Sequence, residues 1–466
     1  MEKIRIGFVP AHREPFDEEW AAHMRKRCLD VFYDFPEMDI VVPDEELTIG
    51  GCIRDDDEAE KVIQLFSENG IDGLVIGTMT FGDEVSALAV ATVFQELPIM
   101  LFGTKEGEFT DEGGRRSDSF CGTLSISSGL HRRQIPFTFG GLVFPEEEEF
   151  QSRLGNFIKT CYICKGFIGA RVGIVGPRPE RFETCIFNED EMMRQFQQRI
   201  VPASLPDIMK IADPKGENEN AIQVLMNEMK NQANLSEISD EVLGKIAGLE
   251  YSLARFAGEK KLSAIGVQCW TAMQEVYGIS PCYAMGRLTD KGIMTSCEVD
   301  VYGALTMLIQ YLASMGKVAP HFIDWTIKHQ EEQDTFLGWH CGNAPPSLAC
   351  DPEQVKIRYQ SVLGVSLGVD RSQGTAEFQL KEGTVTLCRL QEQNGDFKML
   401  ITTGESVHAD QDLRGSWSWI KVEDLDDLYS TLIYEGFVHH ASMIHGDYLE
   451  PIADACMYLG IEPVIV

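Results

Sequence analysis

Residues 71–104 read IDGLVIGTMTFGDEVSALAVATVFQELPIMLFGT and contain two short apolar runs on either side of a helical pattern. The runs at 73–76 and 99–102 have the length and composition of buried strands, and residues 84–95 have the spacing of a helix. A strand, a helix and a second strand in this order predict a βαβ unit in a parallel sheet.

The same alternation extends in both directions from this unit. Further strands are expected at 4–9 and 40–42, further helices at 20–32 and 57–69, and a helix over about 146–166 leads out of the first domain. We therefore predict a doubly wound, Rossmann-like α/β domain over residues 1–165.

Two more domains follow in the prediction, because 466 residues are too many for one core. Residues 166–344 repeat the α/β pattern, with strands expected at 172–175, 263–268 and 293–298 and helices at 190–197, 221–233, 242–258 and 302–314. Residues 345–466 instead predict a smaller antiparallel, β-rich, barrel-like domain. Its strands are expected at 355–363, 375–380, 384–391 and 399–402, between turns such as Glu382-Gly383 and Asn394-Gly395.

The charge of the chain excludes two kinds of partner. With 73 acidic and 40 basic residues the formal net charge is −33, which is incompatible with a nucleic acid or an anionic membrane as the main partner. The N-terminal residues lack the pattern of a signal peptide, and no apolar run reaches the roughly 18 residues of a membrane helix. We therefore expect a cytoplasmic protein. Its thirteen cysteines are expected to be reduced, and the Cys161/Cys164 pair to be two buried free thiols and not half of a zinc site.

Acidic residues follow two predicted strands of the second domain. Glu275 comes after a loop that follows the strand at 263–268, and Glu298 and Asp300 end the strand at 293–298 and lead into a helix. Ligands bind at the carboxyl ends of parallel strands, so all three are candidate site residues. Simpler roles exist: an Asp before a helix is usually an N-cap, and a single Glu usually faces solvent.

Histidines provide the second signal. The chain has only ten histidines, and three of them, His439, His440 and His445, lie within seven residues. His340 lies in a further Gly-Trp-His-Cys stretch. Carboxylates and imidazoles together, without thiolates, favour Mn²⁺, Co²⁺ or Mg²⁺ over structural zinc. No dinucleotide or P-loop fingerprint occurs. The basic run 131–133 is expected to be a solvated or inter-subunit face, or else to hold an anionic substituent of the substrate.

Three of these segments resemble the L-fucose isomerase family, with the L-arabinose isomerases as more distant relatives. Residues 297–300 with the Gly-Ala-Leu-Thr-Met of 303–307 resemble the segment that bears the family's metal-binding aspartate. The stretch ending in Glu275 resembles the segment of the metal-binding glutamate. Residues 439–442 with Gly446 resemble the stretch of the metal-binding histidine, which falls on His440. The order of domains is also similar.

The resemblance implies a metal-dependent aldose–ketose isomerase that moves a proton through an ene-diol. It implies Glu275 and Asp300 as the acid–base pair, and Glu275, Asp300 and His440 as ligands of Mn²⁺, with Co²⁺ or Mg²⁺ as alternatives. Glu298, His340, Trp417 and Arg13 are candidate substrate contacts, with Trp419 as the alternative to Trp417. A homo-oligomer, a hexamer or another even assembly, is implied as well, in which residues 10–18 of a neighbouring subunit complete the site.

The substrate is left open. The resemblance implies an L-fucose, D-arabinose or L-arabinose type of sugar. The chain is shorter than the L-fucose enzymes, and Gly436 stands where the family has an asparagine four residues before its histidine. Two alternatives follow: the same chemistry on an acidic or sulfonated sugar, or a non-catalytic sugar-binding or regulatory protein on the same scaffold. Loss of turnover on removal of Glu275 would distinguish an enzyme from a binder.

Overall fold

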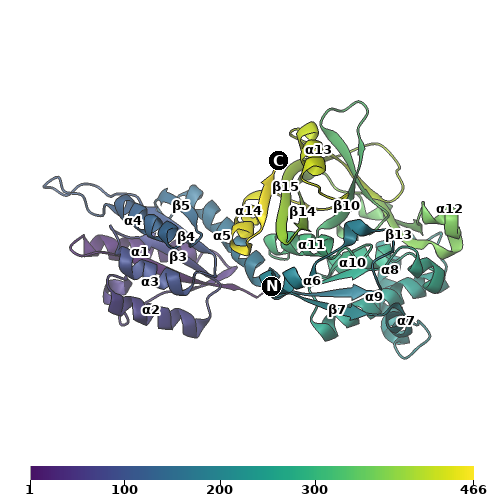
Figure 1. The fold of residues 1–466 in the computed structure, drawn as a ribbon, viewed down its shortest axis with the longest axis horizontal. Helices are drawn as coiled ribbons and strands as arrows, with labels where there is room; N and C mark the ends of the chain where they lie inside the picture. Colours follow the sequence, from purple (N-terminus) through teal and green to yellow (C-terminus); the bar gives the residue numbers. More distant parts are fainter. Residues whose placement is uncertain (1) are drawn as a thin grey trace. The chain divides into compact units, whose positions relative to one another are not determined.

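Three β-sheets organise the chain, and a computed structural model describes them over residues 2–466 (Figure 1). The chain divides into two units. The first comprises residues up to Lys165 together with Met457–Leu459, and the second comprises the remainder. The first unit holds one sheet and the second unit holds two.

The sheet of the first unit is parallel throughout, in the order β2-β1-β3-β4-β5. Its strands are β1 (Ile4–Ala11), β2 (Met38–Val41), β3 (Gly73–Thr78), β4 (Ile99–Thr104) and β5 (Thr138–Val143). Its helices are α1 (Glu18–Phe32), α2 (Asp56–Asn69), α3 (Glu84–Val93), α4 (Ser119–Arg132) and α5 (Glu148–Phe167).

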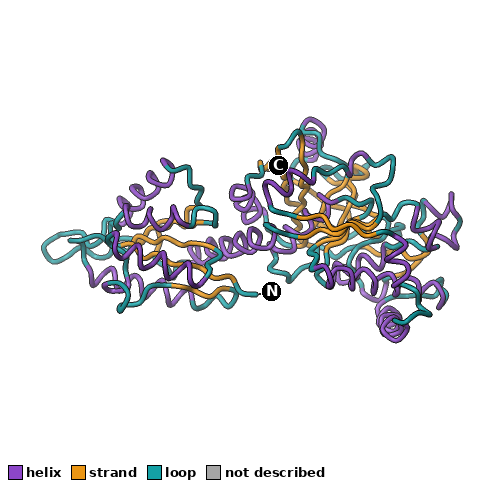
Figure 2. Tube along the Cα trace, turned by 60° about the horizontal axis from the view of Figure 1, so that its bottom comes forward, coloured by secondary structure: helices purple, strands orange, loops and turns teal. Residues whose placement is uncertain are grey.

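Helices cover both faces of this sheet (Figure 2). Apolar residues of α2, α3 and α4 form one core with the strands, and Phe8 of β1, Phe32 of α1 and Phe150 of α5 pack on one another on the other side. Helices α1, α2 and α3 each begin after an aspartate whose carboxylate accepts a backbone N–H of the first turn.

A second parallel sheet opens the second unit, in the order β7-β6-β8-β9. Its strands are β6 (Arg171–Val175), β7 (Arg199–Ala203), β8 (Ala264–Val267) and β9 (Met294–Ser296). The helices of this region are α6 (Glu189–Phe196), α7 (Leu205–Ile211), α8 (Glu219–Gln232), α9 (Asp240–Lys260), α10 (Cys282–Asp290) and α11 (Val301–Ala313). Because β8 and β9 are parallel neighbours, the residues that follow them emerge at the same edge of the sheet.

The third sheet is large and mixed, in the order β12-β13-β16-β11-β10-β17-β14-β15-β18, with an additional β16–β15 pairing. Its strands are β10 (His321–Lys328), β11 (Thr335–His340), β12 (Lys356–Tyr359), β13 (Gln373–Gln379), β14 (Gly383–Gln393), β15 (Asp396–Val407), β16 (Ser416–Val422), β17 (His440–His445) and β18 (Glu462–Ile465). Helices α12 (Leu363–Leu367), α13 (Leu425–Tyr434) and α14 (Leu449–Leu459) connect them. Strands β10 and β11 precede residue 344, yet they pair with strands that follow it.

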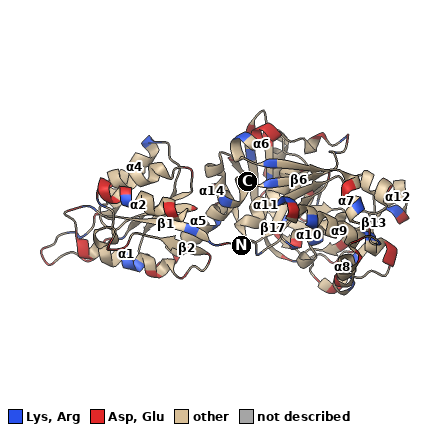
Figure 3. Cartoon of the chain, turned by 90° about the horizontal axis from the view of Figure 1, so that it is seen from below, with Lys and Arg blue, Asp and Glu red and all other residues tan. Residues whose placement is uncertain are grey.

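The mixed α/β class is thus confirmed, with two parallel sheets before a large mixed one. The Rossmann-like detail, the barrel-like form and the domain limits 1–165, 166–344 and 345–466 stay predictions. Cys161 and Cys164 are buried free thiols, as expected. Acidic and basic residues occur on helices of both units (Figure 3). Within residues 2–466, no helix is long and apolar enough to cross a membrane.

Candidate functional site

The link between β9 and α11 has an unusual backbone. Glu298 and Val299 have φ values of 53° and 58°, in the left-handed region that a β-branched residue rarely adopts. Each such residue costs on the order of 1–3 kcal/mol and persists only where its surroundings impose it. The double turn directs Glu298 inward and places Asp300 as the N-cap of α11, where its Oδ1 accepts the N–H of Gly303 at 2.9 Å.

Asp300 is the centre of a buried charged network. Its carboxylate accepts two hydrogen bonds from Arg389, with Nη1 to Oδ2 at 2.5 Å and Nη2 to Oδ1 at 3.2 Å, and Nδ1 of His440 lies 2.9 Å from Oδ2. All three side chains are about 1% exposed. Burial by itself would raise the pKa of Asp300, but the attraction of Arg389 and His440 outweighs it and the pKa lies well below its ordinary value.

Two further carboxylates face the other nitrogen of His440. Oε2 of Glu298 and Oδ1 of Asp324 each lie 3.7 Å from Nε2, and neither oxygen has a hydrogen-bond partner. Burial raises the pKa of Glu298 well above its ordinary range, and Cys269, Asp324 and Asp300 raise it further. Burial also raises the pKa of Asp324 to about 6, although His440 acts in the opposite direction.

His340 joins this group from the end of β11. A nitrogen of its ring, an oxygen of Glu298 and a nitrogen of His440 lie within 4.8 Å of one another. Its ring packs against Phe322, with centroids 5.3 Å apart. Burial lowers the pKa of His340 well below its usual value, and the nearby His440 lowers it further. The imidazole is therefore neutral at pH 7 and has a lone pair to offer.

These donors suit a divalent cation. Unpartnered oxygens of Glu298 and Asp324 both face one imidazole nitrogen, and a buried carboxylate without a partner is costly unless a cation or a proton joins it. Oxygen and imidazole donors together fit Mn²⁺, Co²⁺ or Mg²⁺ better than a soft ion.

The structure brings together some of the predicted site residues and separates others. Asp300, Glu298, His340 and His440 form the buried cluster just described. Glu275 is instead an exposed residue of a short π-helix, Met273–Tyr277, where its Oε1 accepts a hydrogen bond from the hydroxyl of Thr271 at 3.1 Å. Among the described residues, no group able to hold a metal includes Glu275. Its pairing with Asp300 as acid and base stays a prediction.

The remaining predicted contacts lie elsewhere. Arg13 belongs to the first unit, where it pairs with Asp83 at 3.3 Å and Glu84 at 2.9 Å. Trp417 is 1% exposed and packs with Trp419 in a small apolar cluster of the third sheet. Their roles toward a substrate stay predictions.

Asp324 and Arg389 were not expected from the sequence. Each is a charged residue that interrupts a short apolar run of its strand, in Phe-Ile-Asp-Trp and Leu-Cys-Arg-Leu respectively. A charge in a buried strand is costly unless it is paired, and that signal could have identified both.

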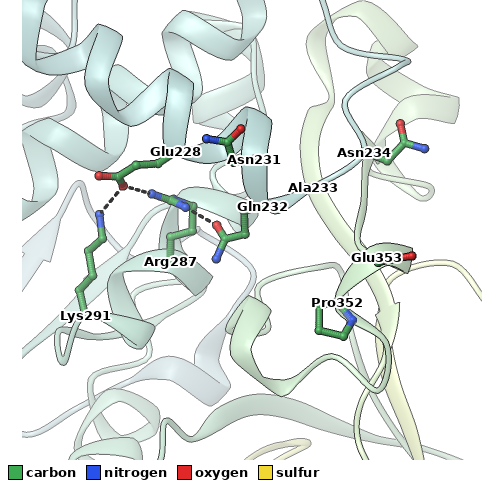
Figure 4. A pocket seen from close by; sticks show the side chains of 9 residues that line it. All are labelled: Glu228, Asn231, Gln232, Ala233, Asn234, Arg287, Lys291, Pro352 and Glu353. Carbon is green, nitrogen blue, oxygen red and sulfur yellow. Dashed lines mark hydrogen bonds and ion pairs between the residues drawn. The ribbon is translucent and has the colours of Figure 1, made fainter.

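A pocket of about 900 Å³ lies apart from these residues in the second unit (Figure 4). Arg287 donates to Glu228 at 2.7 Å and to Glu250 at 2.6 Å, and Lys291 also pairs with both acids. The two basic side chains at this pocket are thus paired with two carboxylates. The lining residues are Glu228, Asn231, Gln232, Ala233, Asn234, Arg287, Lys291, Pro352 and Glu353. None of them is a predicted site residue, and no unmatched cation is present there to select an anionic sugar.

Comparison with known proteins identifies the class of this protein. Residues 7–168 match the family model for the N-terminal domain of fucose/sulfoquinovose isomerase, and residues 338–465 match that for the C-terminal domain of L-fucose isomerase. The chain belongs to the fucose isomerase family, whose members are aldose–ketose isomerases. The expected resemblance and the expected enzyme class are therefore confirmed.

Individual relatives cover the chain to different extents. A sulfoquinovose isomerase of Priestia aryabhattai is 26% identical over 469 residues, which is 99% of each chain. One of Alkalicoccus urumqiensis is 27% identical over 390 residues, 82% of this chain and 83% of the relative. An L-arabinose isomerase of Shouchella clausii is 20% identical over 335 residues, 69% of this chain and 65% of the relative.

Proposed function

We propose that this protein is a metal-assisted aldose–ketose isomerase whose substrate is a sulfonated hexose. The observation that carries the catalytic part is the pair of unpartnered carboxylate oxygens, of Glu298 and Asp324, facing Nε2 of His440. The substrate part rests on similarity to proteins named sulfoquinovose isomerase over nearly the full length of both chains. A sulfonated sugar is therefore proposed as the substrate in place of a sugar of the L-fucose type.

The cation would be held by Glu298, His340 and His440, whose donor atoms lie within 4.8 Å of one another, and Asp324 faces the same Nε2 of His440 from 3.7 Å. When bound, a divalent ion polarises the oxygens on C1 and C2 of the sugar and stabilises the charge of the enediolate. Mn²⁺ fits this donor set, and Co²⁺ and Mg²⁺ are the alternatives.

The proton is moved by a side chain of the same cluster. Isomerisation requires a base that takes a proton from the carbon beside the carbonyl, and an acid that returns one to the neighbouring carbon. General acid–base catalysis works best when pKa values lie near the working pH. Asp324, with a pKa of about 6, suits the role of base, and once protonated it is the acid that returns the proton to the neighbouring carbon.

Asp300 acts on the site through His440 in this proposal. Its Oδ2 accepts the hydrogen bond of Nδ1, which keeps the proton on that nitrogen and leaves Nε2 free as a ligand. Arg389 in turn fixes the carboxylate of Asp300 with two hydrogen bonds. Asp300 and Arg389 are thus positioning residues.

A groove of about 630 Å³ in the same unit has the chemistry for the sugar and its anionic tail. His440, Asp324, Trp339 and Trp417 are paired in one row across β17, β10, β11 and β16, so they are neighbours on one face of the sheet. Trp339 also lines the groove, together with Lys328, His329, Arg414 and Glu331 among others. We propose that the sugar ring stacks on Trp339 and that Lys328, whose pair with Asp426 is exposed to solvent and therefore weak, attracts the sulfonate. Arg414 is already paired with the buried Glu377 and is not assigned to the substrate.

The test is a matched pair of sugars. Sulfoquinovose and D-glucose differ only in a sulfonate in place of the 6-hydroxyl, so conversion to the ketose is followed by NMR for both, beside L-fucose and L-arabinose. We expect turnover of the sulfonated sugar alone, abolished by EDTA and restored by Mn²⁺. Asp324→Asn is expected to lower kcat at least about 100-fold, whereas Asp190→Asn, at an exposed position of α6, leaves it unchanged.

Other outcomes identify the other candidate functions. Turnover of L-fucose or L-arabinose but not of the sulfonated sugar would show that the substrate is a neutral sugar. Binding of sugar without turnover of any of them would favour a sugar-binding protein. The homo-oligomer, in which Arg13 reaches a neighbouring subunit's site, is proposed together with this function and is checked by light scattering.

A further inference from the structure

We propose that Cys269, Cys297 and Glu298 form a second cation site, selective for a thiophilic divalent ion such as Zn²⁺, which adjoins the site that serves isomerisation and shares Glu298 with it. The two sulfurs and a carboxylate oxygen lie within 4.8 Å of one another, and all three residues are buried. Nothing in the proposed isomerase chemistry uses the two thiols.

The spacing of the donors is close to that of a bound tetrahedral ion. Sγ of Cys269 lies 3.3 Å from Oε1 of Glu298, and Sγ of Cys297 lies 4.0 Å from Nδ1 of His340. With Zn–S bonds of about 2.3 Å and Zn–N or Zn–O bonds of about 2.0–2.1 Å, donors around one tetrahedral zinc are roughly 3.3–3.8 Å apart. Shifts of under about 1 Å would therefore complete a site of two sulfurs, one oxygen and one nitrogen.

Both sulfurs also accept hydrogen bonds from N–H groups. The backbone N–H of Glu298 donates to Cys269 at 3.3 Å, and the side-chain amide of Asn343 donates to Cys297 at 3.6 Å. Such hydrogen bonds orient thiolates and stabilise their negative charge around metals. This second observation is independent of the spacing. It points to sulfurs arranged as ligands.

The fold supplies the two thiols from adjacent strands. Cys269 follows β8 and Cys297 follows β9, and these strands are parallel neighbours whose carboxyl ends meet. The left-handed turn at Glu298 then presents the two oxygens of its carboxylate to different partners. Oε1 faces Cys269, and Oε2 faces His440. Glu298 is therefore shared between a thiol side and an imidazole side.

A different thiol provides the alternative location. Cys185, Asp300 and His440 also have donor atoms within 4.8 Å of one another, and Sγ of Cys185 lies 3.9 Å from Nδ1 of His440. At this alternative location, both carboxylate oxygens of Asp300 already accept hydrogen bonds from Arg389 and Gly303. An ion there would have one sulfur ligand, whereas the proposed site gives two, so the count of sulfurs separates the two locations.

The first experiment uses the whole, unmodified protein and Cd²⁺ as the probe, in excess Mg²⁺ to occupy sites made of oxygen and nitrogen. X-ray absorption at the cadmium edge is expected to give two sulfur neighbours per bound ion. One sulfur would place the ion at Cys185, none would place it at carboxylates and imidazoles, and either result overturns the proposal. The readout is independent of turnover, so it stands whether or not the proposed isomerase activity is found.

Variants provide the second measurement. Cys297→Ser is expected to weaken Cd²⁺ binding by more than about tenfold and to remove the cadmium–thiolate charge-transfer absorption. Cys185→Ser is the matched control, a buried thiol on the other side of His440, and is expected to retain both. Circular dichroism checks that each variant folds. If Cys297→Ser is folded and binds Cd²⁺ as tightly as the unmodified protein, the site is excluded.

Discussion

Asp300 combines two roles that the sequence could suggest only separately. Its position before a helix predicted an N-cap, and the resemblance predicted a site residue; the structure makes it the N-cap of α11 and places it 2.9 Å from His440. Its partner Arg389 is 89 positions away, and no local pattern links the two. Similarly, Asp324 reaches His440 only because β10 and β17 pair. Contacts of this kind depend on strand order, which short-range patterns do not encode.

The buried Asp300–Arg389 pair leads to a prediction about stability. Arg389→Met leaves the carboxylate without its main counter-charge, and removal of one partner of a buried pair costs about 3–5 kcal/mol. We expect a loss of that size in the free energy of unfolding, measured with urea. The double variant Asp300→Asn/Arg389→Met should lose less than the sum of the single changes, because no unpaired charge remains.

The exposed Arg153–Glu149 pair of α5 serves as the control. Its geometry is comparable, at 2.8 Å, but both side chains are well exposed to solvent. Arg153→Met should therefore leave the stability almost unchanged. Equal effects of the two arginine substitutions, or strict additivity in the double variant, would contradict the interpretation of Arg389 as a buried counter-charge.

His321 predicts sensitivity to acid. Burial lowers its pKa to about 3, and His445 contributes. Between pH 6.5 and 3 the unfolded chain binds a proton at this residue and the folded chain does not, so stability falls as the pH falls, by up to about 1.4 kcal/mol per pH unit. In His321→Gln, the free energy of unfolding should fall less steeply with falling pH, by the contribution of one proton. Urea titrations at pH 7, 6 and 5 measure this slope. A slope that His321→Gln leaves unchanged would argue against a neutral buried His321.

At the scale of elements, periodicity located most helices and strands, and tertiary geometry set where they end. The helix expected at 302–314 is α11, Val301–Ala313. The strand expected at 293–298 is shorter, Met294–Ser296, because Glu298 and Val299 turn into left-handed conformations. Strands β10 and β11 were not expected, since a single acidic residue interrupts the apolar pattern of one and the other follows a polar loop.

The close packing of α10 predicts the effect of a single methyl group. A Cβ on Gly286 would lie 2.4 Å from the carbonyl oxygen of Ala344, a backbone atom that cannot move aside by a side-chain rotation. Although alanine favours helix over glycine, overpacking of this kind costs about 1–3 kcal/mol. We expect Gly286→Ala to be destabilising, as measured by thermal unfolding.

Gly258 in α9 is the matched control, because nothing lies within 4 Å of the position of its Cβ. There the same substitution should stabilise the protein by about 0.5–1 kcal/mol through helix propensity alone. If both alanines stabilise the protein, the contact between α10 and the segment around Ala344 is looser than the structure has it. That segment carries Asn343, so Gly286→Ala should also weaken the cadmium–thiolate signal.

At the scale of the whole molecule, the sequence predicts the fold class and the net charge, but not which strands pair. The mixed α/β class followed from the order of strand and helix patterns, and strands after residue 344 were expected from the turns there, although as a smaller antiparallel domain and not as a large mixed sheet. The composition of the third sheet, with strands drawn from 321 to 465, could not be predicted, because residues far apart in the chain pair in it. The net charge of −33, in contrast, is known from the sequence alone and acts on every part of the fold.

This charge predicts how the stability depends on salt. Like charges repel more strongly in the folded chain than in the expanded unfolded chain, and the repulsion is screened over about 30 Å at 0.01 M salt but over about 8 Å at 0.15 M. We expect the melting temperature to rise by a few degrees between 10 and 150 mM NaCl, measured by differential scanning calorimetry with EDTA present. Choline chloride at the same ionic strength should give the same rise, since screening does not depend on the identity of the cation. A rise with NaCl alone would indicate binding of Na⁺, and a fall in both salts would mean that the attraction within exposed pairs, such as Arg153 with Glu149, outweighs the repulsion among the surplus acids.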